Sequence, residues 1–143
     1  MLSRRLLRVK VAKSLYAHLK SGSDNLKASE KYLVESIDKA YDLYFQMMSL
    51  IVEVSRYAES RQELAKQKRL ATHEDLNPNR RFVDNSVIAL IANSDSVNDV
   101  LASRKLSWTN HYDAVKDVYN RLVEAEFYRS YMALPTVSFN DDR

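Results

Sequence analysis

The chain has 143 residues, of which 45% are hydrophobic and 29% are charged, and its formal net charge at pH 7 is +3. This length suits one domain that buries about two-thirds of its unfolded surface. One glycine and two prolines are too few for a turn-rich β protein and favour long helices. The absence of cysteine excludes disulfides and thiolate metal sites and fits a reducing compartment, so we expect a cytoplasmic protein. No apolar run approaches the ~18 residues of a membrane span, so we expect no membrane partner.

Basic charge is concentrated in the first twenty residues. No acidic residue precedes Asp24, and six basic side chains come before it: Arg4, Arg5, Arg8, Lys10, Lys13 and Lys20. The remainder of the chain therefore carries a net charge of −3. Charge confined to one segment indicates a localised anionic partner.

This segment is predicted to be a helix that begins at Ser3 as N-cap and ends before Gly22. Its core-facing stripe recurs every four residues: Leu7, Val11, Leu15 and Leu19. Arginines overlap the start of the stripe, where cations oppose the helix dipole and where guanidinium groups can clamp phosphates. We predict that the helix binds a phosphate-bearing partner through Arg4, Arg5, Arg8, Lys10 and Lys13.

Two other interpretations of this segment remain open. A basic amphipathic helix is often the solvated side of a core helix, with no ligand. An arginine-rich, acid-free N-terminus also fits an organelle transit peptide, although such a peptide does not require so regular a stripe.

The clearest periodicity lies further along, in an apolar series whose spacing alternates between four and three: Leu33, Ile37, Ala40, Tyr44, Met47, Ile51, Val54 and Ala58. A helix from about Leu26 to Leu70 would be ~65 Å long. The series fits a coiled coil or dimer interface, or the spine of an intramolecular bundle. A flanking row at Leu43, Leu50, Tyr57 and Leu64 widens the stripe and favours the bundle.

Beyond a loop over residues 71–77, shorter helices are expected. Asn77 and Pro78 predict a helix start, Ser96 with Asp99 predicts a brief helix, and Asn110 predicts a longer one over residues 113–132. Arg80 and Arg81 fit either an anion site or two exposed cations. Trp108 is expected to pack against the end of the bundle.

We therefore expect an all-α protein, a bundle of four to six helices with one long spine helix, in a single domain over residues 1–134. The predicted core includes Leu15, Ile37, Tyr44, Ile51 and Leu122. Residues 135–143 are polar and aperiodic and read as a tail, a linker or a frayed end.

Nothing in the sequence predicts an enzyme or a cofactor. His18, His73 and His111 are far apart and match no ligand spacing, and a metal site at His73-Glu74-Asp75 is not favoured. A single glycine cannot build a phosphate-binding loop. We expect a non-enzymatic protein.

The opening R-R-L-L-R-V-K-V-A-K-S-L-Y resembles the first helix of the transcription antitermination protein NusB family. Arg4, Arg5 and Arg8 match the family's arginine cluster, and Leu15-Tyr16 match its Leu-Tyr pair, whereas Val9 stands where a Glu is usual. The stretch L-N-P-N-R-R-F-V-D-N, residues 76–85, is similar to long-form members. The family's second half has no counterpart here, so the chain resembles the N-terminal part of such a protein, with residues 135–143 leading to a missing C-terminal half.

The resemblance implies an all-helical protein that binds single-stranded boxA-like RNA together with NusE, a small-subunit ribosomal protein. The complex acts with RNA polymerase in antitermination, notably on ribosomal RNA operons. Only Arg4, Arg5 and Arg8 carry over as RNA contacts, and Leu15 and Tyr16 would be structural. The alternative function is a helical protein–protein interaction module that uses the seam over residues 33–58 without binding nucleic acid. The salt dependence of binding separates the two.

Overall fold

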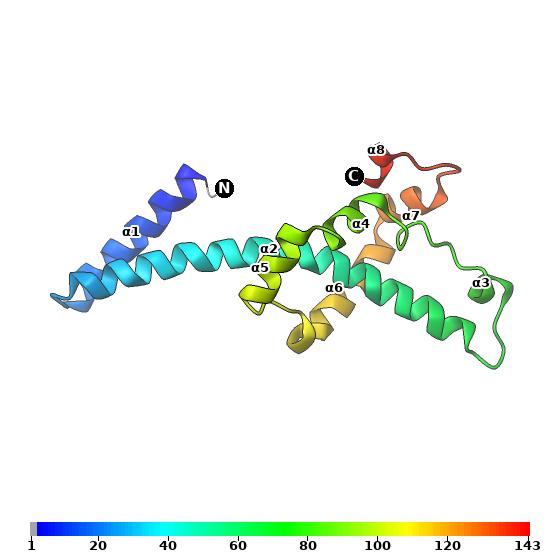
Figure 1. The fold of residues 1–143 in the computed structure, drawn as a ribbon, viewed down its shortest axis with the longest axis horizontal. Coiled ribbons are helices and arrows are strands. Elements are labelled where there is room, and N and C mark those ends of the chain that lie inside the picture. The colour runs from blue at the N-terminus through cyan, green and yellow to red at the C-terminus, as the bar shows by residue number, and fades with distance from the viewer. Residues whose placement is uncertain (1–2) are drawn as a thin grey trace. The chain divides into compact units, whose positions relative to one another are not determined.

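A computed structural model describes residues 3–143 of the chain, and all the regular elements within them are helices (Figure 1). In chain order they are α1 (Arg4–Ser21), α2 (Leu26–Lys66), α3 (His73–Leu76), α4 (Ser86–Ala92), α5 (Asp95–Ser103), the 3-10 helix η1 (Thr109–His111), α6 (Tyr112–Glu124), α7 (Glu126–Ala133) and α8 (Phe139–Asp142). The predicted all-α fold with one long helix is confirmed. Met1 and Leu2, which open the predicted basic segment, lie outside the described residues.

The helices are more numerous than the four to six expected. Within residues 3–143 there are eight α-helices, but α3 and α8 have only four residues each. The single helix expected over 113–132 is divided, because Ala125 between α6 and α7 has extended backbone angles (φ −71°, ψ 136°).

Two predicted helix starts are corrected. Pro78 does not begin a helix, and Asn77 instead ends α3. The next helix, α4, starts at Ser86, because the Asn85 side chain accepts hydrogen bonds from the two amides that follow Ser86. The brief helix α5 begins at Asp95, one residue ahead of the expected Ser96.

The chain separates into two compact units whose boundary lies inside α2, between Phe45 and Gln46. This differs from the single domain expected over residues 1–134. The first unit contains α1 and residues 26–45 of α2. The second contains the rest of α2 and all later helices.

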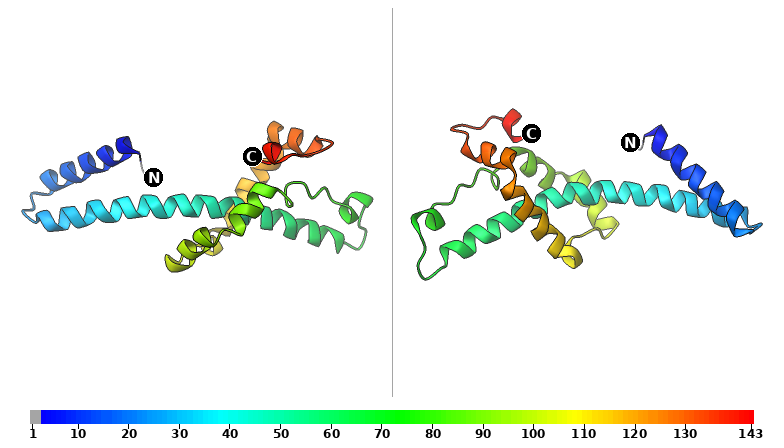
Figure 2. Two further views of the ribbon diagram at one scale, coloured as in Figure 1. Left: turned by 45° about the horizontal axis from the view of Figure 1, so that its top comes forward. Right: turned by 180° about the vertical axis from the view of Figure 1, so that it is seen from behind.

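The first unit is an antiparallel helical hairpin, in which α1 runs back along residues 26–45 of α2 in both views of Figure 2. Ser3 begins α1 as predicted, since its hydroxyl accepts a hydrogen bond from the Leu6 amide at 3.2 Å. Gly22 ends α1 in the left-handed conformation (φ 61°), which glycine adopts without strain. Asn25 caps the start of α2 by accepting a hydrogen bond from an amide of its first turn.

The predicted core face of the hairpin is exposed. Leu15, Leu19 and Tyr44 leave 54%, 78% and 58% of their surface open, and Ile37 is half-buried. The side of α1 that meets α2 carries Ser14, which is only 7% exposed. The leucine stripe therefore lies beside the contact between the two helices and not within it.

The second unit holds the buried apolar core: Val52, Val54, Ala58, Ile88, Val97 and Val115. Among the predicted core residues of this unit, Leu122 is half-buried but Ile51 is 46% exposed. Helical spacing places Ile51 on the same side of α2 as Val54 and Ala58, so its exposure shows that this side is not covered at the level of Ile51.

Trp108 fixes the connector between α5 and α6 to α2, in keeping with its predicted packing role. Its indole Nε1 donates to the Gln46 carbonyl at 2.9 Å and lies 3.2 Å from the Ser49 hydroxyl. The indole is half-buried. A single side chain thus ties residues separated by about sixty positions of sequence.

The tail beyond Pro135 is ordered into α8 and is not a frayed end. Ser138 and Asp141 form a reciprocal capping box at its start. The Asp142 carboxylate then accepts hydrogen bonds from the amide and hydroxyl of Ser86, at 2.9 and 2.6 Å, at the start of α4. No helix in the described part of the chain is both long and apolar enough to cross a membrane.

Candidate nucleic-acid interface

Polar contacts fix which side of α1 faces α2. Lys10 Nζ donates to the Ser36 carbonyl at 2.6 Å. Nearer the turn, Ser14 Oγ donates to the Ser29 carbonyl at 3.2 Å, and His18 Nδ1 lies 2.8 Å from the Ser29 hydroxyl. These contacts recur every four residues along α1, so they set the rotation of the helix about its axis.

This rotation leaves the three arginines of α1 in solvent. Arg4, Arg5 and Arg8 are exposed, and the first turn of α1 contains no acidic residue. No ion pair joins any of the three to an acid among residues 3–143. Cations at a helix N-terminus oppose the macrodipole, at a cost of a few tenths of a kcal/mol each. These guanidiniums are therefore open donors that contribute nothing to the stability of α1.

The two predicted lysines differ from each other. Lys13 is exposed like the arginines, whereas Lys10 is half-buried and engaged with the Ser36 carbonyl. A phosphate would compete with that carbonyl for the Lys10 ammonium. Lys10 is thus a hairpin contact, and the exposed set is Arg4, Arg5, Arg8 and Lys13.

Arg80 and Arg81 lie in the other unit and are held by the protein. Arg80 Nη2 contacts Glu59 at 2.9 Å and Asp84 at 3.1 Å, and the hydrogen bond to Glu59 is the main cause that raises the Arg80 pKa. Arg81 Nη1 donates to the carbonyls of Tyr131 and Met132. The sequence left open an anion site or two exposed cations, and the structure shows neither, because both arginines are half-buried and engaged by the protein.

Three basic residues near the end of α2 also have partners. Lys66 pairs with Glu63 at 2.7 Å, Lys68 pairs with Asp75 at 2.8 Å, and the Arg61 guanidinium stacks over Tyr119 at 5.8 Å from the ring centre. Asp75 belongs to a capping box with Thr72 as well. Among the described residues no three His, Asp or Glu side chains gather as metal ligands.

A polar network at the start of α4 was not anticipated from the sequence. Tyr131 donates its hydroxyl proton to Asp142 Oδ1 at 2.7 Å, and Asn85 Nδ2 donates to the Asp142 carbonyl at 3.0 Å. The hydrogen bond from the Ser86 side chain is the first cause that holds the Asp142 pKa below its usual 3.8. Nearby, burial raises the pKa of Tyr128 to about 12. The cap preference of Asn85 was the one signal that could have located this network.

Comparisons with known proteins add no information about the role of α1. No family model, no curated protein and no solved structure matches the chain.

Proposed function

We propose that α1 is a binding site for single-stranded RNA, contacted by Arg4, Arg5 and Arg8 with Lys13 beside them. The observation that carries this proposal is the set of three exposed arginines with no acid in the same helical turn. Guanidinium groups bind phosphates through several hydrogen bonds and also stack on unpaired bases.

The residues that resemble the NusB family extend this proposal to a role. The chain acts as a non-enzymatic component of a transcription antitermination complex in the cytoplasm, with boxA-like RNA, NusE and RNA polymerase as partners. Two separate observations support this role for Arg4, Arg5 and Arg8: they match the arginine cluster of the family, and they are exposed. Leu15 and Tyr16, the other pair of the resemblance, are 54% and 66% exposed and are free to contact a partner.

The test compares two triple variants that remove the same charge from the hairpin. Arg4→Ala/Arg5→Ala/Arg8→Ala removes the open arginines of α1. Lys27→Ala/Lys31→Ala/Lys39→Ala removes three exposed cations of α2. Affinity for a fluorescent boxA-like RNA and for a scrambled RNA is measured over a salt series, with NusE present and absent.

We expect the arginine variant to lose affinity and to flatten the salt slope by about two units, since each contact to a single-stranded phosphate contributes about 0.7. The lysine variant keeps a slope close to that of the parent chain. Equal losses in both variants would indicate nonspecific attraction to a basic hairpin, and no loss in either would remove RNA binding from α1. Thermal stability of the arginine variant should be unchanged or slightly raised, because three cations leave a helix N-terminus.

A second candidate function is the helical protein–protein interaction module. It is favoured by the exposed apolar side chains of the hairpin, which RNA binding does not use. Binding of a protein partner with little salt dependence, and no affinity for RNA, would support this candidate.

A further inference from the structure

One side of the α1–α2 hairpin carries an open apolar groove. Its volume is about 240 Å³, and it is lined by Val11 and Leu15 of α1 and by Leu26 and Leu33 of α2. Leu15 and Leu26 leave 54% and 65% of their surface exposed. The apolar stripe of a helix in a globular protein normally packs on a further layer. Residues 3–45 provide no such layer on this side.

A regular series of α2 residues begins in the groove and continues along the helix beyond it: Leu26, Glu30, Leu33, Ile37, Ala40 and Tyr44. The spacing alternates between four and three, so these side chains project within a narrow arc of the helix. Tyr44 remains 58% exposed. This spacing is the one by which helices pair in coiled coils and four-helix bundles.

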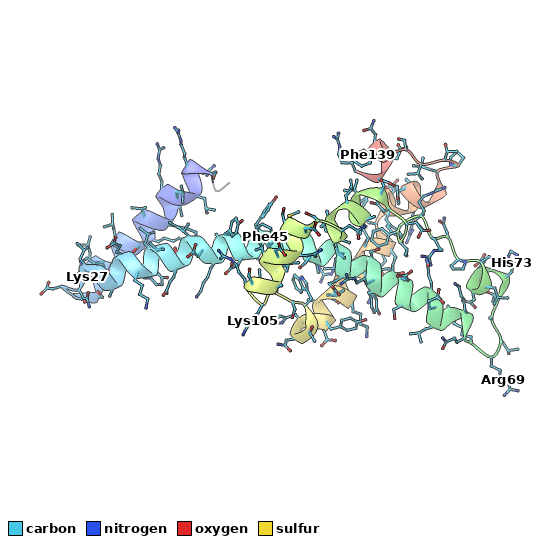
Figure 3. All side chains as sticks on the ribbon, viewed as in Figure 1. Lys27, Phe45, Arg69, His73, Lys105 and Phe139 are labelled. Carbon is cyan, nitrogen blue, oxygen red and sulfur yellow. The ribbon has the colours of Figure 1, made fainter. Side chains whose placement is uncertain are left out.

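Glu30 is the single charged member of this series. It lines the groove and forms no ion pair with any residue of the described chain. It follows Lys27, which Figure 3 labels at the hairpin turn, by three residues, so it lies towards that turn. Arg8 flanks the same side at the other end, because the contact of Lys10 with Ser36 places the start of α1 away from the turn. A face with a cation at one end and a carboxylate at the other is complementary to itself when inverted.

We propose that this face pairs with the same face of a second copy of the chain, turned end for end about a two-fold axis, to form a four-helix bundle. The contact is then isologous, as in most homodimers. Each hairpin turn lies against the open end of the other hairpin. Arg8 of one copy comes level with Glu30 of the other, and this pair fixes the register of the contact as polar residues in helical seams do.

The exposed apolar area is of the size that such a dimer requires. Leu15, Leu26 and Tyr44 are more than half exposed and leave roughly 100 Å² open each, while Val11, Leu33 and Ile37 leave about half as much, so the face presents on the order of 500 Å². Two copies then cover about 1,000 Å², the lower limit for a specific interface, before polar residues at the edge are included. Arg5 and Lys13 lie outside the arc of the groove and stay open to RNA, whereas Arg4 and Arg8 lie on its side of α1. Pairing therefore goes beyond the proposed RNA site and competes with RNA for these two arginines.

Sedimentation equilibrium of the full chain over a wide concentration range tests the proposal. We expect the parent chain to reach twice its 16.6 kDa mass. Leu15→Glu places a charge in the groove and should leave a monomer with unchanged helicity, since Leu15 is 54% exposed in the single chain. Val9→Glu is the matched control, because Val9 is 42% exposed on the opposite side of the same helix. It should remain dimeric.

A charge exchange tests the register. Arg8→Glu and Glu30→Arg should each weaken the dimer at least several-fold, and the double variant should recover most of the loss. A monomeric parent chain at all concentrations would overturn the proposal. A dimer that Leu15→Glu and Val9→Glu weaken equally, or a double variant no tighter than the single ones, would overturn the assignment of this face and its register.

Discussion

The two units of the chain differ in what they bury. Residues 46–143 enclose six buried apolar side chains, from Val52 in α2 to Val115 in α6. Among residues 3–45 the one buried side chain is Ser14, and the large apolar residues are exposed or half-buried. We infer that apolar burial in the second unit is the main source of the monomer's stability, whereas the hairpin presents surfaces that a partner can cover.

The contrast is sharpest within α2, because one helix takes part in both units. Its four–three series continues through the whole helix, yet Tyr44 is 58% exposed and Ala58 is 2% exposed. Within the second unit, α4, α5 and α6 lie against residues 49–57 of α2. Periodicity therefore identifies the side of a helix that is suited to packing, and the neighbouring elements determine whether that side is filled.

Truncations in the two units give the largest expected contrast. Val115→Ala should lower the free energy of unfolding by about 2 kcal/mol. Val115 is fully buried, so the change removes two buried methyl groups and leaves a cavity. Leu15→Ala should change it by less than about 0.5 kcal/mol, the usual range for surface positions. Chemical denaturation at concentrations where the chain is monomeric measures both. A loss of several kcal/mol for Leu15→Ala would restore the predicted core role and contradict the comparison.

The cap of α4 gives the next effect. Asn85 is 6% exposed, accepts from the amides of Val87 and Ile88, and donates to the tail at Asp142. Asn85→Ala should cost about 1–2 kcal/mol, a value at the upper end for helix caps. Asn110→Ala, at an exposed position, should cost almost nothing. Equal effects of the two changes would show that the contact between α4 and α8 adds no stability.

The smallest expected effect is a pH dependence confined to the second unit. Hydrogen bonds from Ser86 hold the Asp142 pKa below its usual 3.8. A lowered pKa stabilises the fold above pH 3.8, and this contribution is lost as the pH falls below that value through the folded-state pKa. The protection of the Ser86 amide, meaning its exchange rate relative to that of an unfolded chain at the same pH, should therefore fall as the pH drops below 3.8 through the folded-state pKa of Asp142. Asp142→Asn should remove the pH dependence, and its persistence would exclude Asp142 as the cause.

The sequence predicted where helices form better than it predicted which helices pack against each other. The Ser3 and Gly22 ends of α1 and the continuous α2 followed from local chemistry, which needs no knowledge of tertiary contacts. Predicted burial failed at Leu15, Tyr44 and Ile51 because burial depends on which element lies opposite. The start at Asn77-Pro78 failed because Asn85 provides a competing cap, which accepts from two amides of α4 and donates to Tyr131 and Asp142.

The candidate site was predictable in part for the same reason. The exposure of Arg4, Arg5 and Arg8 follows from their charge. The hydrogen bond from Lys10 to the Ser36 carbonyl, which removes Lys10 from the exposed set, depends instead on how α1 is rotated against α2. Ser14 and His18, which fix that rotation, form no recognisable motif. Polar residues spaced four apart look the same in a sequence whether they face another helix or face solvent.

Residue-resolved native-state hydrogen exchange at low protein concentration tests the central contrast most directly. Amides of α2 between residues 52 and 58 should exchange only through global unfolding, because their side chains form the core. Amides of α1 should exchange much faster through local opening of the hairpin, and RNA or a second copy should slow them. Protection of α1 equal to that of residues 52–58 in the isolated monomer would contradict the account.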